Sequence, residues 1–215
     1  MNLISNNCVG AAIYNELNMK YNNPFMWCFI RGNDFYTLIY NYNYINFNNY
    51  VLEKSCLDSS TELYNNSYSM HIDNLFYAHY IHYIYDNNYE IPTKREEITG
   101  EHSRDLLYKY ADKLCIEKYV NRLERMKEEP VFFISQSKYS SWNEIRNILY
   151  LKSKYKRVFL LPEKFPYESE KVDKNCEIIC QPETGVKWTN EKAKYVITHS
   201  NIIKEIYEKE TQEKN

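Results

Sequence analysis

Short apolar runs that end in a proline or a polar turn recur along this chain, and most alternate with segments of helical periodicity. Each run has the length of a buried strand. Strands that alternate with helices build a mostly parallel sheet with helices on both faces. We therefore predict a single α/β domain over residues 1–215 with a Rossmann-like three-layer core, whose strands are residues 2–5, 25–30, 131–134, 157–161, 177–180 and 194–198.

Helical periodicity fills most of the intervals between these runs. Apolar residues there recur every three or four positions, as on the buried face of an amphipathic helix. The cluster Gly32-Asn33-Asp34 is expected to cap the helix that follows it, and Ser140 or Ser141 is expected to cap another. The predicted helices are residues 8–18, 35–42, 104–127, 141–153 and 200–210.

The middle of the chain, approximately residues 43–103, departs from this alternation. Residues 43–70 are rich in Asn, Tyr and Ser and predict short strands and loops. Residues 71–85 are aromatic throughout and hold three of the five histidines. The polar residues 86–103 have the composition of a loop or a lid. We therefore expect an irregular, aromatic-rich insertion that forms an embedded subdomain or a lid.

Composition argues against several classes of partner. The net charge of −2 provides no basic face for a nucleic acid. No run approaches the ~18 apolar residues of a membrane span. The N-terminus leads into a strand and not into a secretory leader, so the six cysteines are expected to stay reduced in the cytoplasm.

Cofactor and metal sites are not expected either. The chain has only four glycines, too scattered for a loop that wraps a nucleotide phosphate. Cys176 and Cys180 lie four positions apart, and no Cys-x-x-Cys pair is present. This spacing argues against a structural zinc site.

Cys8 is the strongest candidate for chemistry. It follows the predicted strand 2–5 and begins the next helix, where free amides and the positive end of the helix dipole favour the thiolate. Ligands of a parallel sheet bind outside the carboxyl ends of its strands. The turn residues Asn6, Asn7 and Val9 could then stabilise an oxyanion through their amides. The alternative is a small buried residue that packs this helix on the sheet.

A nucleophilic cysteine needs a base, usually a histidine. His79 and His82 lie on opposite faces if their aromatic segment is a strand, and share a face if it is a helix. Alternatively, both are half-buried residues that bond to the backbone. His199 is expected to end the last strand at the edge that holds Cys8, or else to begin a helix beside a Ser200 cap.

The N-terminal third resembles a bacterial family of unknown function whose members are often labelled exopolysaccharide biosynthesis proteins. The matching segments are Ile4-Ser-Asn-Asn-Cys8-Val-Gly10, Ile13-Tyr14, Tyr21-Asn-Asn-Pro24-Phe25 and Asp34-Phe35. The stretch Asn121-Arg122…Arg125 resembles the paired arginines of that family, and His79-Tyr80 or His82-Tyr83 could match its His-Tyr pair.

A more distant resemblance is to a papain-like cysteine peptidase family of unknown function. Pro24-Phe25-Met26-Trp27 is similar to its Pro-Phe-x-Trp segment, although Met26 stands where that family usually has Asp. Both resemblances imply a catalytic role for Cys8, with a later histidine as its base.

These observations predict a protein of bacterial surface-polysaccharide synthesis. We expect a cysteine-dependent acyl transferase or hydrolase that acts on a glycan or an activated-sugar intermediate, with Cys8 as nucleophile. The tyrosine and asparagine content favours a second hypothesis, a glycan- or partner-binding module without catalysis. A sugar transferase of the same pathway is the third. The sequence predicts no oligomeric state.

Overall fold

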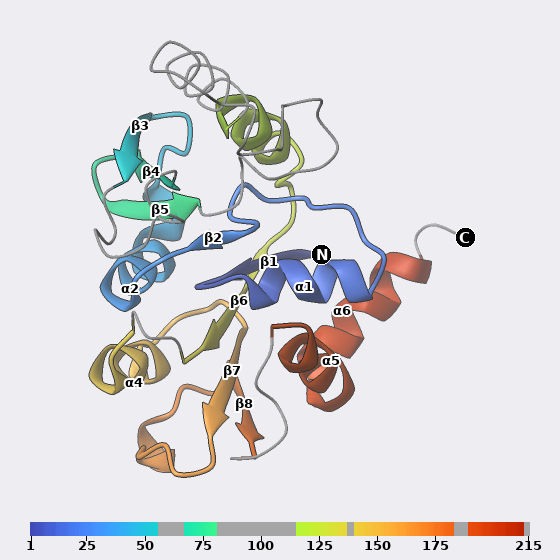
Figure 1. Cartoon of the computed structure of the whole chain (residues 1–215). Coiled ribbons are helices and arrows are strands. Elements are labelled where there is room, and N and C mark those ends of the chain that lie inside the picture. The colour runs from blue at the N-terminus through green and yellow to red at the C-terminus, as the bar shows by residue number, and fades with distance from the viewer. Residues whose placement is uncertain (56–66, 81–114, 137–139, 183–188, 213–215) are drawn as a thin grey trace, which may run out of the picture.

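The computed structural model describes residues 1–55, 67–80, 115–136, 140–182 and 189–212, and these contain two four-stranded sheets (Figure 1). The first is parallel, in the order β1-β6-β7-β8, with β1 (Asn2–Ser5), β6 (Pro130–Ser135), β7 (Arg157–Pro162) and β8 (Cys176–Gln181). The second is antiparallel, in the order β2-β5-β4-β3, with β2 (Cys28–Phe29), β3 (Tyr50–Ser55), β4 (Ser67–Ile72) and β5 (Phe76–Tyr80). The predicted α/β class and parallel sheet are confirmed.

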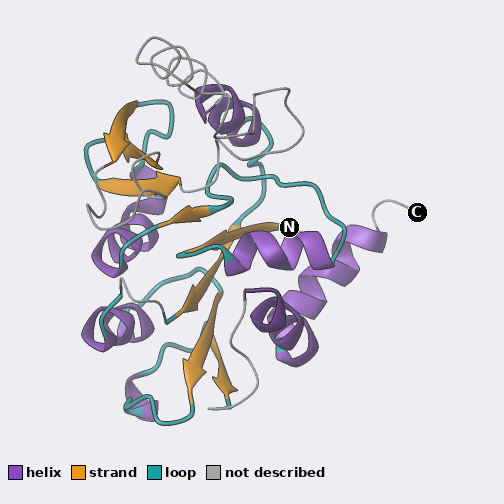
Figure 2. Ribbon diagram, viewed as in Figure 1, coloured by secondary structure: helices purple, strands orange, loops and turns teal. Residues whose placement is uncertain are grey.

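Helices lie on either side of the parallel sheet (Figure 2). Leu3 and Phe133 pack into a core with α1 (Val9–Glu16), α5 (Thr189–His199) and α6 (Asn201–Gln212). Their strand neighbours Ile4 and Phe132 point the other way, into a core with α2 (Gly32–Asn41) and α4 (Trp142–Tyr150). Burial on both faces explains why these strands read as continuous apolar runs.

The antiparallel sheet shares the second of these cores. Met70 and Ala78 lie in the same cluster as Phe132 and the apolar residues of α2. The amide of Ile30, just after β2, donates to the carbonyl of Asn6 at 3.1 Å. The two sheets are thus joined at the carboxyl end of β1. Two short 3-10 helices, η1 (Tyr42–Tyr44) and η5 (Ser169–Lys171), and the helical residues 115–123 are also described.

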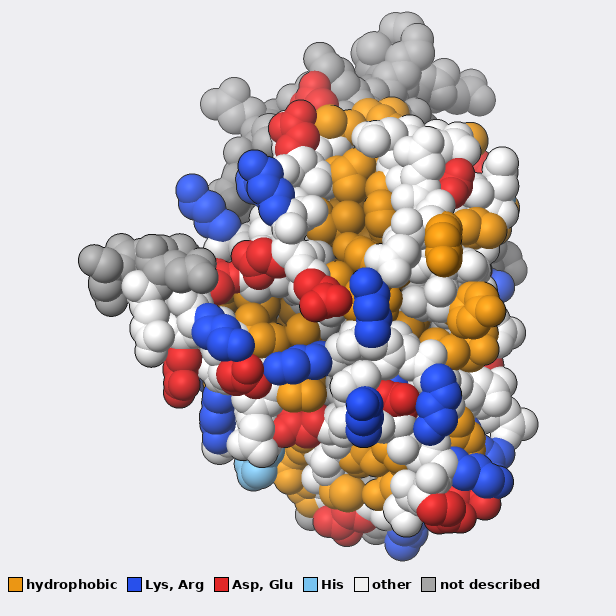
Figure 3. Space-filling view, turned by 180° about the vertical axis from the view of Figure 1, so that it is seen from behind, with side chains coloured by type: hydrophobic (Ala, Val, Ile, Leu, Met, Phe, Trp, Pro, Cys, Tyr) orange, Lys and Arg blue, Asp and Glu red, His pale blue; other side chains and the backbone are white. Residues whose placement is uncertain are grey.

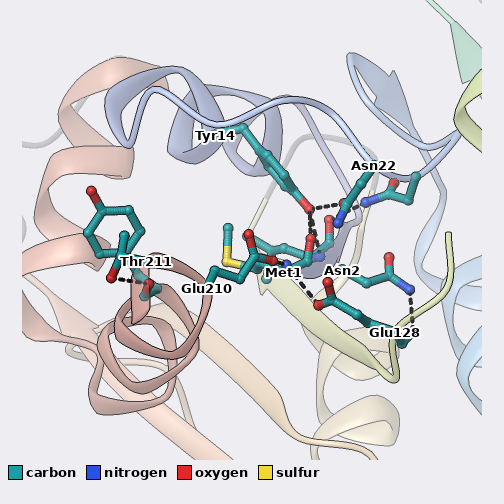
Figure 4. A network of polar contacts seen from close by, with 10 residues as sticks. Met1, Asn2, Tyr14, Asn22, Glu128, Glu210 and Thr211 are labelled. Carbon is teal, nitrogen blue, oxygen red and sulfur yellow. Dashed lines mark hydrogen bonds and ion pairs between the residues drawn. The ribbon is translucent and has the colours of Figure 1, made fainter. Parts of the chain in front are cut away.

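Side chains satisfy the open edge of β1. The amide of Leu3 donates to the Tyr14 hydroxyl at 3.1 Å, and the carbonyl of Leu3 accepts from Asn23 Nδ2 at 2.9 Å. The Tyr14 hydroxyl also bonds to the carbonyl of Met1 and to Asn22 (Figure 4). An edge strand with its polar groups paired offers no template for another chain.

The same region holds an ion-pair network that involves α6 (Figure 4). The amino group of Met1 lies 2.7 Å from Glu128 Oε2 and also pairs with Glu210 of α6. Asn2 Nδ2 donates to the carbonyl of Glu128 at 2.9 Å. The start of β1, the segment before β6 and the last helix are therefore fixed to one another.

The predicted strand over residues 194–198 is wrong, because these residues belong to α5. Tyr, Val, Ile and Thr favour a strand over five positions. The buried residues Ala193, Val196, Ser200 and Ile203, however, recur at helical spacing through α5 and α6. Burial over this longer stretch outweighs the local β propensity.

The predicted strand over residues 25–30 is much shorter in the structure. Residues 24–27 form a turn, and only the two residues of β2 pair. Ser141 does cap α4, through a capping box with Glu144. Of the predicted helix 104–127, residues 115–123 are helical, and residues 104–114 lie outside the described residues. The predicted loop or lid over residues 86–103 lies outside them too.

The face opposite to that of Figure 1 carries positive and negative side chains intermixed over its lower half, with apolar side chains above them (Figure 3). The described side chains form no continuous basic surface on this face. Within the described part of the chain, no helix combines the length and the apolar content needed to cross a membrane.

Candidate functional site

The turn that holds Cys8 lies at the carboxyl end of β1, as predicted. Asn6 bonds to Ser135 of β6 twice, through Asn6 Nδ2 to the carbonyl at 2.9 Å and through the Ser135 amide to Asn6 Oδ1 at 3.0 Å. The amide of Asn7 donates to Ser5 Oγ at 3.2 Å, and the amide of Val9 donates to Asn7 Oδ1 at 3.1 Å. These two amides therefore have acceptors within the turn, and the oxyanion role stays a prediction.

Cys8 is the N-cap residue of α1 and is half-buried. Burial raises the pKa of its thiol to about 11, opposed only in part by a hydrogen bond from its own backbone amide. Burial raises the pKa of the Cys28 thiol, which is fully buried, and the charge of a Cys8 thiolate would raise it further. Burial thus opposes the thiolate form that a nucleophile requires, and the catalytic role of Cys8 stays a prediction.

We expect Cys8 to react slowly with alkylating agents in the folded protein. With a pKa near 11 instead of the ordinary ~8.5, its thiolate fraction at pH 7.5 falls by roughly two orders of magnitude. Alkylation by iodoacetamide, followed peptide by peptide with mass spectrometry, measures this rate. The exposed Cys180 is the internal comparison. Faster labelling of Cys8 than of Cys180 would contradict the raised pKa and support the nucleophile.

His79 lies in β5, so the strand alternative holds for residues 76–80, and residues 81–85 of its segment lie outside the described residues. Its register partner is Phe29, whereas Cys28 pairs with Tyr80, so His79 and Cys28 face opposite sides of the sheet. Its Nδ1 lies 2.6 Å from Ser69 Oγ. Burial, followed by the charge of Arg31, lowers the pKa of His79 to about 4, so the ring is neutral at pH 7.

Of the other predicted bases, the structure describes only His199, and no hydrogen bond joins its ring to Cys8. His199 ends α5, not a strand, and is exposed, with Nδ1 2.8 Å from the carbonyl of Tyr195. His82 lies outside the described residues. Within those residues, no hydrogen bond joins a histidine ring to Cys8. The Cys-His pairing stays a prediction without a contact to support it.

A basic pocket of about 420 Å³ lies between the end of α1 with the segment that follows it and the helical residues 115–123, which are yellow-green in Figure 1. None of the described residues that line it is acidic. Its volume falls within the ~300–1,000 Å³ of small-molecule sites. The lining includes Lys20, Lys118, Arg122, Arg125, Asn15 and Tyr21.

Tyr21 organises this pocket. The guanidinium carbon of Arg122 lies 5.2 Å from the centre of the Tyr21 ring, a cation–π distance. The Tyr21 hydroxyl accepts from Trp27 Nε1 at 2.9 Å and donates to Asn15. Trp27 has a φ of 57°, uncommon for a bulky residue. The surrounding contacts therefore hold Arg122 and Asn15 in place before any ligand arrives.

Comparison with known proteins identifies the family. A family model described as a domain of unknown function, DUF1919, matches residues 1–204. The chain belongs to the DUF1919 family. No curated protein matches it.

The basic pocket of this DUF1919 chain was not predicted from the sequence. The net charge of −2 conceals it, because basic and acidic residues are nearly balanced overall. A signal was present, since Lys118, Arg122 and Arg125 recur at i, i+4 and i+7, the spacing expected of one helical face. The similarity of Arg122 and Arg125 to a family arginine pair pointed to the same residues.

Proposed function

We propose that this protein binds an activated-sugar intermediate of bacterial surface-polysaccharide synthesis and holds its phosphate in the basic pocket. The observation that carries the proposal is the set of four cationic side chains, Lys20, Lys118, Arg122 and Arg125, around a pocket with no acidic residue in its described lining. Activated sugars are phosphate esters, and guanidinium groups bind phosphate oxygens in bidentate fashion. The resemblance to exopolysaccharide proteins favours a sugar over other phosphorylated ligands.

We also propose that the core has the Rossmann-like three-layer architecture predicted from the sequence. The pocket lies beside α1, the first helix that packs on the parallel sheet. It assigns no reaction to Cys8. Burial raises the pKa of the Cys8 thiol, and His79 contacts Ser69 and Phe29. These observations lend no support to the acyl-transferase or hydrolase hypothesis or to the papain-like resemblance. A sugar transferase would require the phosphate contact proposed here, whereas a glycan- or partner-binding module would use it only for a phosphorylated ligand.

Calorimetric titration with UDP-glucose and glucose 1-phosphate tests the proposal, with glucose as the uncharged control. The variant Lys20→Gln/Arg125→Gln removes two exposed cations from the pocket. We expect it to weaken the binding of UDP-glucose by at least about tenfold, since charge-assisted hydrogen bonds are lost.

The variant Lys127→Gln/Lys152→Gln is the matched control, because it removes the same charge from exposed positions outside the pocket lining. It should bind like the unchanged protein. Binding of the sugar phosphates no tighter than that of glucose, or equal weakening in both double variants, would overturn the proposal.

A further inference from the structure

The basic pocket places its cations at two depths. Arg122 is only 7% exposed, and its Nη1 donates to the carbonyl of Met26 at 3.4 Å. Together with the Tyr21 ring, this contact fixes an inner guanidinium. Lys20 and Arg125 are exposed and belong to the outer part of the lining.

The cations are also spread along the pocket. Lys118 and Arg122 lie about one turn apart on the helical residues 115–123, and Arg125 lies in the turn that follows, seven positions after Lys118. Lys20 comes from a different wall, the segment after α1. If a single phosphate is bound at Arg122, the outer cations remain available to bind a second anionic group on the same ligand.

We infer that the pocket is built for a pyrophosphate group, with one phosphate at the inner Arg122 and the second between the outer Arg125 and Lys20. This inference rests on the proposed function and names the linkage within that ligand. Two linked phosphates match cations at two depths, whereas a monophosphate matches only one of them.

Pyrophosphate-linked sugars come from two sources, nucleoside diphosphate sugars and polyprenyl pyrophosphate carriers. The two share the group that the pocket would contact. They differ in what lies beyond it, a soluble nucleoside in one and a membrane-embedded chain in the other.

The first experiment compares inorganic pyrophosphate with inorganic phosphate, and UDP-glucose with glucose 1-phosphate, by calorimetry on the full chain. We expect the pyrophosphate member of each pair to bind at least about tenfold more tightly. The variant Arg125→Gln should abolish most of this preference and leave phosphate binding within about twofold. The variant Lys127→Gln should keep the preference.

A second arm uses phosphatidylcholine vesicles with and without undecaprenyl pyrophosphate. Binding in the nucleotide arm or the vesicle arm supports the inference, and the tighter arm identifies the source. Equal affinity for phosphate and pyrophosphate, or an equal loss of both in Arg125→Gln, overturns the inference and leaves the proposed function intact. Failure of every phosphorylated probe overturns both.

Discussion

Replacing Asp173 by asparagine is expected to lower the free energy of unfolding by about 3–5 kcal/mol, because it leaves a buried guanidinium without its counter-charge. Arg157 begins β7 and is 0% exposed. Its Nη2 lies 3.0 Å from Asp173 Oδ1, and its Nη1 donates to the carbonyl of Ile148 in α4 at 2.8 Å. The arginine thus joins α4, β7 and the loop before β8.

Asparagine is the informative substitution at position 173. Asp173 Oδ1 also accepts from the amide of Asn175 at 2.9 Å, and an asparagine Oδ1 can keep that bond. The loss therefore reports the charge and not the turn. Urea denaturation measures this loss of stability as a fall in the midpoint urea concentration, provided that the dependence of the unfolding free energy on urea (the m-value) is unchanged.

Two controls separate the buried pair from charge in general. Glu168→Gln removes one partner of the exposed Lys171 pair and should change stability little, since such pairs contribute little in water. Arg157→Met/Asp173→Asn removes both buried charges and should be less destabilised than Asp173→Asn alone. If the double variant is the less stable of the two, the charge argument fails.

The strands of the parallel sheet could be predicted because their signal is local. β6, β7 and β8 each lie within a residue or two of the apolar run that predicted them. The helical conformation of residues 194–198 could not be predicted in this way, because the buried residues that favour a helix extend from Ala193 to Ile203. The full burial of Arg157 could not be predicted from a local sequence pattern either, since its partners are 9 and 16 residues away in the chain.

The site was harder to predict than the fold for a physical reason. The position of Cys8 at a strand end was predictable, but the pKa of its thiol depends on its burial in the folded protein. The pocket joins Lys20 to a helical face about 100 residues later, and no local pattern states that these segments meet. The spacing of Lys118, Arg122 and Arg125 was the only feature of the sequence that could have predicted a basic site.

Replacing Gly10 by alanine is the second change for which we expect a large effect. Alanine is the better helix former by about 1 kcal/mol, so helix propensity alone predicts stabilisation of α1. A Cβ at position 10, however, would lie 2.4 Å from the Cβ of Ser5 and 3.2 Å from its Oγ. Because Ser5 Cβ is attached directly to the backbone of β1, relief requires α1 to move away from the sheet. We therefore expect a net destabilisation of about 1–3 kcal/mol in urea denaturation.

The double variant Ser5→Gly/Gly10→Ala tests this cause. Ser5→Gly alone is also expected to destabilise, because it removes the acceptor for the amide of Asn7. It also removes the Cβ that a new alanine would meet, so the double variant should be more stable than the sum of the single changes by roughly 0.5–3 kcal/mol. Strict additivity would show that Gly10 is not held by close packing. The predicted coupling would instead explain the small residues on either side of Cys8 as packing between α1 and β1, with no reaction at the thiol required.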